Sequence, residues 1–216
     1  LFPYTTLFRS DFTTPLTLFA LDLNVMELTV MRRQPQQFVS DGIEVRQFWA
    51  VSSDGERIPY FHVGKNAVPD TPTLVYAYGG FGVPELPHYL GSIGKYWLEE
   101  GNAFVLANIR GGGEFGPRWH QAAQGISKHK SVDDLLAVVR DLSERGMSSP
   151  EHIGLQGGSN GGLITAAAFV REPQSIGALV CEVPLTDMIR YPLLSAGASW
   201  TDEYGNQIGR ASCRER

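Results

Sequence analysis

The sequence predicts an α/β fold with a mostly parallel β-sheet, and three observations lead to that prediction. From residue 73 onwards, short apolar segments typical of strands alternate with segments typical of helices. The strand segments are almost continuously apolar, as expected for a sheet that is covered on both faces. A Gly-x-Ser-x-Gly motif, Gly157 to Gly161, lies between one of these strands and the helix that follows it.

Residues 11–63 are predicted to form β-structure without a helix. The segments rich in alternating or β-branched residues are 16–19, 27–30, 44–51 and 57–63. The last two flank Asp54-Gly55, a dipeptide that favours a hairpin turn in which both central residues have positive φ. Residues 65–72, which contain two prolines, are expected to form a loop.

The region after residue 73 contains four predicted strands, at 74–78, 103–109, 152–156 and 178–183. A helix at 93–100 is expected to end at Gly101, because glycine is common just past the last residue of a helix. Another helix is expected at 163–170, directly after the serine motif.

The helix predicted between these two has the clearest amphipathic pattern. Its apolar residues recur at helical spacing from Val132 to Leu142, which gives the helix one apolar face. Ser131 and Asp134 have the spacing of a capping box, so the helix is expected to begin there and to stop near Gly146.

Ser159 is the candidate nucleophile of this sequence. In the nucleophile elbow of α/β-hydrolases, the turn from strand to helix is so tight that its flanking positions must be glycine. A serine hydroxyl is a weak nucleophile at neutral pH and needs a base, usually a histidine that a carboxylate orients. In α/β-hydrolases the serine comes first along the chain, then the acid, then the histidine.

No histidine follows Ser159 in the sequence. The five histidines are His62, His88, His120, His129 and His152. Asp187 and Asp202 do follow the serine, but Asp187 comes too soon for the usual acid, and both are interpreted as structural or surface residues. We therefore expect an internal fragment whose acid and base lie beyond its end.

Residues 1–10 and 207–216 are expected to be translated sequencing adapter, which has to be set aside before the fold is considered. Phe2 to Ser10 can be written as the codons of a common adapter. The reverse complement of that DNA, shifted by one base, encodes Ile208 to Glu215. Removing both ends takes away four arginines but one glutamate, so the remaining segment is more acidic than the formal net charge of -5 indicates.

Charge and hydropathy exclude two classes of partner. The acidic balance argues against a nucleic-acid surface. No apolar stretch approaches the roughly 18 residues that a membrane-spanning helix needs. We therefore expect neither nucleic acid nor membrane as a partner.

Glycines and histidines in the middle of the chain suggest two other kinds of site, a phosphate-binding loop and a metal site. The run Gly111–Gly113 lacks the spacing and the Lys-Ser/Thr pair of a phosphate-binding loop, and it is interpreted as a turn leaving a strand, which Arg110 holds through a carboxylate. His120 and His129 have no metal-ligating neighbours in the sequence, so no metal or cofactor is expected. His120 is interpreted as a loop or packing residue.

Four sequence blocks occur in order between residues 73 and 205. They are Tyr76 to Phe81 (YAYGGF), Ala107 to His120 (ANIRGGGEFG followed by WH), Gly157 to Leu163 (GGSNGGL) and Gly197 to Tyr204 (GASW followed by Y). Together they resemble the prolyl oligopeptidase family of serine peptidases. Four ordered blocks are much more specific than one Gly-x-Ser-x-Gly motif, which any α/β-hydrolase can show.

The resemblance implies roles for three residues in catalysis. Ser159 would be the nucleophile. Asn160 would supply its backbone N–H, and Tyr78 its phenol, to the oxyanion that forms on the substrate carbonyl. It also implies an apolar pocket for the substrate side chain, formed by Phe81 and Trp200.

Two further statements about substrate binding follow from the resemblance. Trp200 would offer the substrate proline a flat ring to stack on. Tyr204 is a weaker candidate for the same pocket.

The resemblance also implies a domain organisation. In that family a β-propeller precedes the hydrolase domain, so residues 11–43 would be the end of a propeller with its linker. Residues 44–206 would then be a partial α/β-hydrolase peptidase domain.

The implied activity is that of a serine endopeptidase that cleaves short proline-containing peptides after proline through an acyl-enzyme on Ser159. The alternatives are an esterase, an oligopeptidase that prefers basic residues, or a fragment that binds peptides without cleaving them. Asn160 and Trp200 favour proline over a basic residue.

Overall fold

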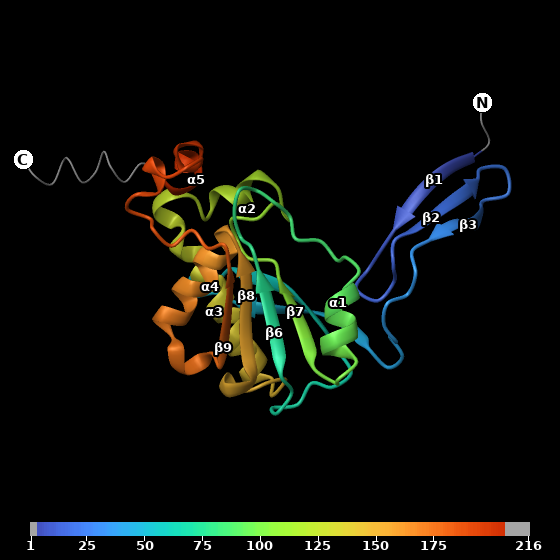
Figure 1. Cartoon of the computed structure of the whole chain (residues 1–216), viewed down its shortest axis with the longest axis horizontal. Helices are drawn as coiled ribbons and strands as arrows, with labels where there is room; N and C mark the ends of the chain where they lie inside the picture. The colour runs from blue at the N-terminus through green and yellow to red at the C-terminus, as the bar shows by residue number, and fades with distance from the viewer. Residues whose placement is uncertain (1–3, 206–216) are drawn as a thin grey trace, which may run out of the picture.

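A computed structural model describes residues 4–205, which form two β-sheets (Figure 1). The smaller sheet is antiparallel and contains β1 (Tyr4–Arg9), β2 (Thr17–Asp22) and β3 (Glu27–Arg33) in that order. It projects from the main body and fits the expected end of a β-propeller (Figure 1). Part of the expected adapter sequence forms β1, while residues 207–216 lie outside the described residues.

The larger sheet has six strands in the order β4-β5-β7-β6-β8-β9. Its strands are β4 (Glu44–Val51), β5 (Arg57–Gly64), β6 (Thr73–Ala77), β7 (Ala103–Ala107), β8 (Ile153–Gly158) and β9 (Ala178–Glu182). The pairs β4–β5 and β5–β7 are antiparallel, whereas β7–β6, β6–β8 and β8–β9 are parallel. The prediction of a mostly parallel sheet is confirmed.

Helices cover both faces of this sheet (Figure 1). They are α1 (Gly91–Ile93), which continues as a π-helical turn (Gly94–Leu98), α2 (Pro117–Gln121), α3 (His129–Glu144), α4 (Asn160–Arg171) and α5 (Thr201–Tyr204). The three predicted helices are present. The short helices α2 and α5 were not expected, because five residues or fewer are too short to show a helical period.

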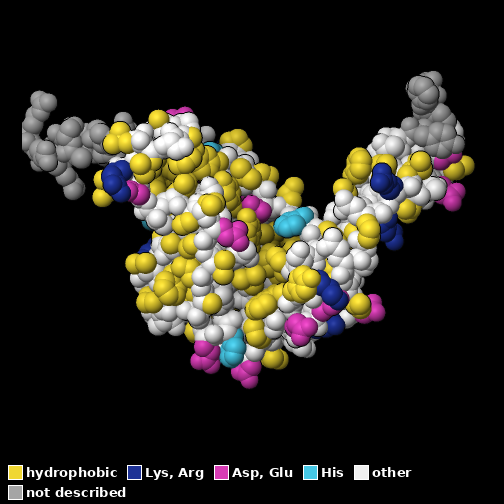
Figure 2. Space-filling view, in the orientation of Figure 1, with side chains coloured by type: hydrophobic (Ala, Val, Ile, Leu, Met, Phe, Trp, Pro, Cys, Tyr) yellow, Lys and Arg dark blue, Asp and Glu magenta, His cyan; other side chains and the backbone are white. Residues whose placement is uncertain are grey.

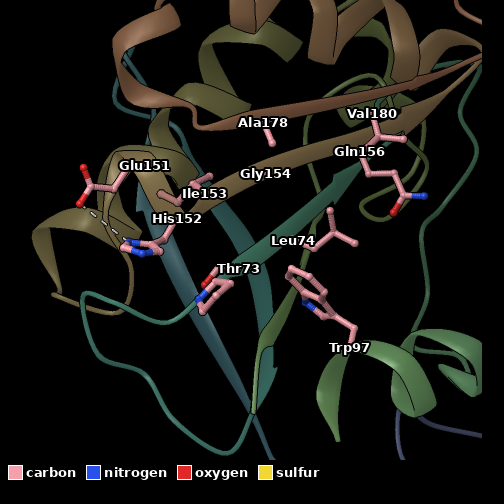
Figure 3. Close-up of a pocket in the computed structure, with 11 residues that line it drawn as sticks. Thr73, Leu74, Trp97, Glu151, His152, Ile153, Gly154, Gln156, Ala178 and Val180 are labelled. Atoms are coloured by element: carbon pink, nitrogen blue, oxygen red, sulfur yellow. Dashed lines mark ion pairs between the residues drawn. The ribbon is translucent and has the colours of Figure 1, made fainter. Parts of the chain in front are cut away.

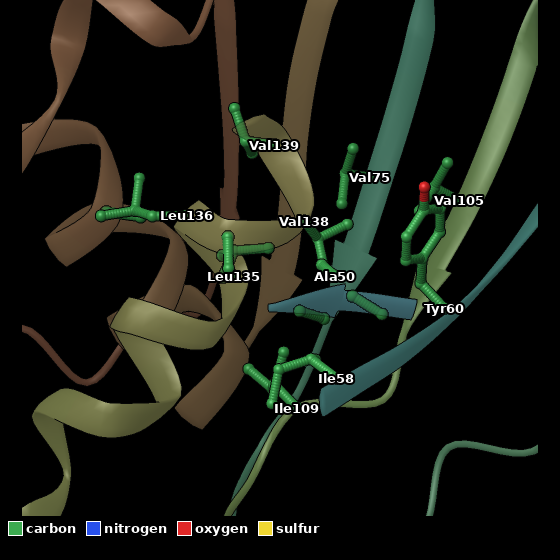
Figure 4. Packing of buried hydrophobic residues seen from close by; sticks show 14 of the residues in the cluster. Ala50, Ile58, Tyr60, Val75, Val105, Ile109, Leu135, Leu136, Val138 and Val139 are labelled. Atoms are coloured by element: carbon green, nitrogen blue, oxygen red, sulfur yellow. The ribbon is translucent and has the colours of Figure 1, made fainter. Parts of the chain in front are cut away.

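Two apolar cores lie on opposite faces of the sheet. Alternate strand residues, such as Val75 and Val105, pack with Leu135 of α3 and Ile164 of α4 (Figure 4). The strand residues that point to the other face form the second core, together with α1 and two phenylalanines from the N-terminal part of the chain. The buried members of this core are Phe12, Phe38, Val63, Leu90, Leu98, Phe104 and Leu106. Both faces of the central strands β6 and β7 are therefore covered, which explains their continuous apolar runs, whereas the edge strand β9 is largely exposed.

Two local predictions are wrong in detail. In the β4–β5 hairpin only Gly55 has positive φ, at 85°, while Asp54 does not. The Gly55 N–H donates to the carbonyl of Ser52, so the loop is a turn followed by one left-handed glycine rather than a two-residue turn. The α3 helix begins at His129 without a side-chain cap, because Ser131 and Asp134 bond to Arg110 instead.

His62 in β5 is expected to make the stability of the fold depend on pH. Its side chain is buried and its Nε2 has no hydrogen-bond partner among residues 4–205. Burial, with a smaller contribution from Arg46, lowers the pKa of His62 to about 4. In the unfolded chain the His62 imidazole takes up a proton near pH 6.5, whereas in the folded chain it does so near pH 4. The folded state therefore has its full stability above pH 6.5 and loses part of it as the pH falls to about 4.

Urea unfolding at pH 7 and pH 4.5 measures this contribution. The free energy of unfolding of the wild type is expected to fall by up to about 3 kcal/mol more than that of His62→Gln. His129→Gln, which changes an exposed histidine, is the matched control and should keep the wild-type pH dependence. Equal pH dependence in His62→Gln and wild type would contradict the assignment.

Candidate active site

The nucleophile elbow is built at the end of β8, where the chain turns into α4. Ser159 has φ 53° and ψ -115°, a backbone conformation that residues with a side chain rarely adopt. A Cβ on Gly157 would collide with the carbonyl oxygen of Gly161, and one on Gly161 would lie 2.5 Å from the carbonyl oxygen of Ala77. The strand, the turn and the helix therefore approach each other at distances that only glycine permits.

Asn160 joins the elbow to the neighbouring strand through its side chain. It is 0% exposed, and its Nδ2 donates to the carbonyl oxygen of Tyr78 at 2.5 Å. Its Oδ1 accepts a hydrogen bond from the hydroxyl of Tyr204 at 2.8 Å. As the first residue of α4, it places its N–H among the amides that have no carbonyl partner inside the helix.

Tyr78 and Phe81 belong to the loop that follows β6. Tyr78 is half-buried, and burial, with smaller effects from Glu203 and Glu85, raises its pKa. The phenol therefore keeps its proton at neutral pH and can donate it in a hydrogen bond. Phe81 has φ 57° and lies edge-on to the ring of Tyr204, with 5.7 Å between the ring centroids.

The two remaining predicted residues lie at α5. Tyr204 is 3% exposed, and its ring is also edge-on to Tyr191 at 5.5 Å. Trp200 is half-buried and directly precedes α5. The structure thus brings Ser159, Asn160, Tyr78, Phe81 and Tyr204 together through the contacts above, whereas no ring stacking or side-chain hydrogen bond connects Trp200 to them.

A buried ionic cluster lies beside these residues and was not predicted from the sequence. Glu203, 3% exposed, accepts from Lys128 Nζ at 2.6 Å and contacts His120 Nε2 at 2.7 Å. Burial raises the pKa of Glu203, but its contacts with Lys128 and His120 outweigh burial and hold the pKa below its usual value. His120 lies in α2 and not in a loop, and it has an acidic partner.

Arg110 fixes the glycine-rich turn, as predicted. The guanidinium is 3% exposed and bonds to Asp134 from Nε at 2.9 Å and from Nη2 at 2.6 Å. Asp54 binds the other side of the guanidinium, from Nη1 at 2.6 Å. Gly111 follows directly and accepts a hydrogen bond from the Gly82 N–H at 3.1 Å, so the turn is linked to the Tyr78–Gly82 loop.

Within residues 4–205 no group forms a hydrogen bond with the hydroxyl of Ser159. Asp187 is paired with Arg190, whose Nε lies 2.7 Å from its Oδ2, and Asp202 is exposed on α5. His120 contacts Glu203, and His152, the histidine nearest to Ser159 in the sequence, has its Nδ1 4.0 Å from Glu151. The described residues thus bring together the predicted nucleophile and the predicted oxyanion donors, without a base in contact with the serine.

Other features of the described residues lie away from Ser159. A mostly apolar cavity of about 520 Å³ lies at the amino ends of β6, β8 and β9, next to Trp97 (Figure 3). Ligands of open α/β sheets bind at the opposite, carboxyl ends, where Ser159 lies.

In the part of the chain that the structure describes, no helix has the length and apolar character to cross a membrane, and no cluster of His, Cys, Asp or Glu could hold a metal ion.

Figure 2 shows a hollow between the three-stranded sheet and the larger body. Lys and Arg side chains on this face are scattered and do not gather in one patch (Figure 2).

Comparison with known proteins places this geometry in a family. The model of the prolyl oligopeptidase family matches residues 90–212. An uncharacterized peptidase, y4nA, from Sinorhizobium fredii is 44% identical over 92% of this chain, and the prolyl endopeptidase of Elizabethkingia meningoseptica is 32% identical over 91% of it. Each match covers 28% of the relative, so the chain spans little more than a quarter of their length.

A solved structure gives the same result. A post-proline cleaving enzyme from Rickettsia typhi superimposes with a TM-score of 0.90 and 39% identity, covering 98% of this chain and 31% of that enzyme. The elbow, the four sequence blocks and the family model, which matches more than half of the residues, agree. This chain belongs to the prolyl oligopeptidase family.

Proposed function

We propose that this chain is the nucleophile-bearing part of a serine peptidase that hydrolyses short peptides on the carboxyl side of proline. The observation that supports this most directly is the connection between Ser159 and Tyr78. Asn160, which follows the nucleophile, bonds to the carbonyl of Tyr78 and so fixes the elbow against the strand end that presents the phenol. Family membership and the names of the relatives point to the same reaction.

The proposed reaction is acyl transfer to Ser159. The serine oxygen attacks the carbonyl carbon of the residue before the scissile bond, while a histidine from outside this chain takes the hydroxyl proton. The negative charge that develops on the carbonyl oxygen is met by the Asn160 N–H and the Tyr78 hydroxyl. A phenol is protonated at neutral pH, and burial raises the pKa of Tyr78 further, so its hydroxyl carries the proton that it donates.

The peptide bond then breaks, the same histidine gives its proton to the leaving amine, and water hydrolyses the acyl-enzyme that remains. The proposed reaction uses no metal or cofactor. Residues 11–43 would belong to a propeller that limits access to short peptides, and residues 44–206 to the peptidase domain. The hollow beside the three-stranded sheet lies between these two parts (Figure 2).

Substrate selection would come from Phe81, Tyr204 and Trp200. The Tyr78–Gly82 loop, which carries the proposed donor Tyr78, is called the oxyanion loop below. The edge-on pair of Phe81, from this loop, and Tyr204 forms an apolar wall. Glu203, the acidic residue next to Tyr204, is already paired with the Lys128 ammonium and contacts the His120 imidazole. This arrangement supports an uncharged residue such as proline over a basic one at the cleavage site.

Peptides that differ only in the residue before the scissile bond test the proposal. The full-length protein is expected to hydrolyse a proline-containing chromogenic peptide at least about tenfold faster than its arginine or alanine counterpart. A fluorophosphonate should label Ser159 and abolish hydrolysis in parallel. Faster cleavage after arginine would instead support the basic-specific alternative, and hydrolysis of esters alone would support an esterase.

A further inference from the structure

Glu203 has no part in the proposed acyl transfer, yet it lies in a buried, paired cluster next to Tyr204, whose hydroxyl bonds to Asn160. Its two carboxylate oxygens contact different groups, the Lys128 ammonium through Oε1 and the His120 imidazole through Oε2. The Lys128 side chain is 13% exposed and that of Glu203 is 3% exposed, so water screens this pair poorly.

Lys128 extends this cluster to the backbone of the oxyanion loop. Its Nζ donates to the carbonyl oxygen of Gly79 at 2.9 Å, as well as to Glu203. Gly79 directly follows Tyr78, so one ammonium group connects α5 with the residue next to the phenol. The Ser131 hydroxyl approaches the same carbonyl at 3.4 Å.

The loop needs such support because Phe81 is strained. It has φ 57°, and a residue with a side chain persists in this region only when its surroundings hold it there. The Phe81 amide lies close enough to Glu203 to lower the pKa of that carboxyl. Tyr204, the next residue after Glu203, packs its ring against the ring of Phe81.

We propose that Glu203 is a positioning residue, which acts through Lys128 and Tyr204 to hold Gly79 and Phe81 and thereby aims the Tyr78 phenol at the oxyanion. The consequence for catalysis rests on the proposed function, whereas the consequence for the loop does not. Removing the carboxylate leaves Lys128 buried without its partner, which loosens the contact with Gly79.

Hydrogen exchange on the 216-residue chain tests the effect on the loop without any activity. The Gly82 N–H, which donates to Gly111, reports how firmly the loop is held. Glu203→Gln removes the anionic partner of the pair and Lys128→Met removes the cationic partner, so the second variant still gives an answer if the first does not fold. Both are expected to raise exchange at Phe81 and Gly82 at least about tenfold.

Asp202→Asn is the matched control, because Asp202 is an exposed acidic residue on the same short helix. It should leave exchange in the loop unchanged. If Glu203→Gln and Lys128→Met both exchange like Asp202→Asn, Glu203 does not hold the loop and the proposal is overturned.

Kinetics of the full-length protein test the effect on catalysis. Glu203→Gln is expected to lower kcat on the order of 10- to 100-fold with KM changed less than about threefold, as misplacement of a transition-state donor does. In a Tyr78→Phe background the same change should cost less than about threefold, because the donor that it positions is already gone. If Glu203→Gln lowers kcat by the same factor in the Tyr78→Phe background as in the wild type, Glu203 does not act through Tyr78.

The two measurements separate the two ideas. A wild-type protein without peptidase activity would refute the proposed function, while hydrogen exchange would still decide whether Glu203 holds the loop. An active enzyme with unchanged kcat in Glu203→Gln would leave the proposed function intact and would refute the positioning role in catalysis.

Discussion

Replacing Ser159 with alanine in the full-length protein is expected to lower kcat about 10⁶-fold, as the loss of the nucleophile does in other serine peptidases. The strained backbone at φ 53° lifts this serine out of the sheet, and no other hydroxyl occupies the elbow between Gly157 and Gly161. The proposed oxyanion donors and the proposed substrate pocket should still support slow turnover above the rate in water. The measurement is steady-state hydrolysis of a proline-containing chromogenic peptide.

Ser143→Ala is the matched control for this prediction. Ser143 lies in α3, and its hydroxyl bonds to the carbonyl of Val139 within the same helix. Its removal should leave kcat and KM at their wild-type values. If Ser159→Ala kept more than a few per cent of the wild-type kcat, the nucleophile would have to be a different residue.

The 216-residue chain by itself should hydrolyse none of these peptides, because all five of its histidines precede Ser159 and none contacts the serine hydroxyl within residues 4–205. Fluorophosphonates react with serines that a base has activated. Stoichiometric labelling of Ser159 in this chain would show that one of these histidines can serve as the base.

The fold was predictable where a local pattern determines the structure. The nearly continuous apolar segments predicted the central strands β6 and β7, because both faces of these strands are covered by the two cores. The elbow was predictable because a strand, a glycine-flanked serine and a helix are adjacent in the sequence. In these cases the residues that interact are also neighbours along the chain.

The residues that hold the site in place were not predictable for the opposite reason. Lys128 and Glu203 are 75 residues apart in the sequence, and His120 and Glu203 are 83 residues apart. Neither pair produces a period or a motif. The one available signal was the position of Glu203 between Trp200 and Tyr204 in a block that resembles the family's substrate pocket.

The wrong capping box at Ser131 and Asp134 has the same cause. The spacing of these two residues suits a helix cap, but tertiary contacts take both side chains away from the helix end. Ser131 donates to the carbonyl of Arg110 at 2.7 Å, and Asp134 accepts from the N–H of Arg110 at 3.0 Å. The pattern was therefore a sign of the glycine-rich turn rather than of the start of α3.

This second use of Asp134 leads to the largest expected change in stability. Asp134 is 0% exposed and accepts hydrogen bonds from the Arg110 backbone, the Arg110 guanidinium and the hydroxyl of Ser52. Asp134→Asn keeps the shape but removes the fully buried one of the two carboxylates, Asp134 and Asp54, that balance the buried Arg110 guanidinium. Breaking one side of a buried ion pair costs about 3 to 5 kcal/mol, so the free energy of unfolding should fall by that amount.

Asp133→Asn is the matched control, since Asp133 is the neighbouring residue of α3 and pairs with the partly exposed Arg171. An exposed pair of this kind contributes about 0 to 1 kcal/mol. Urea unfolding of the two variants gives the comparison, and similar unfolding midpoints would mean that the buried pair does not stabilise the fold.

Removing both members of the pair should restore part of the lost stability. In Arg110→Met/Asp134→Leu no buried charge is left without its partner, and apolar replacements of buried ion pairs are often neutral or stabilising. Asp54 keeps Lys130 at 3.3 Å and is itself partly exposed, so it tolerates the loss of Arg110. A double variant less stable than Asp134→Asn would show that Arg110 stabilises the turn mainly through its own hydrogen bonds and packing, not through charge balance.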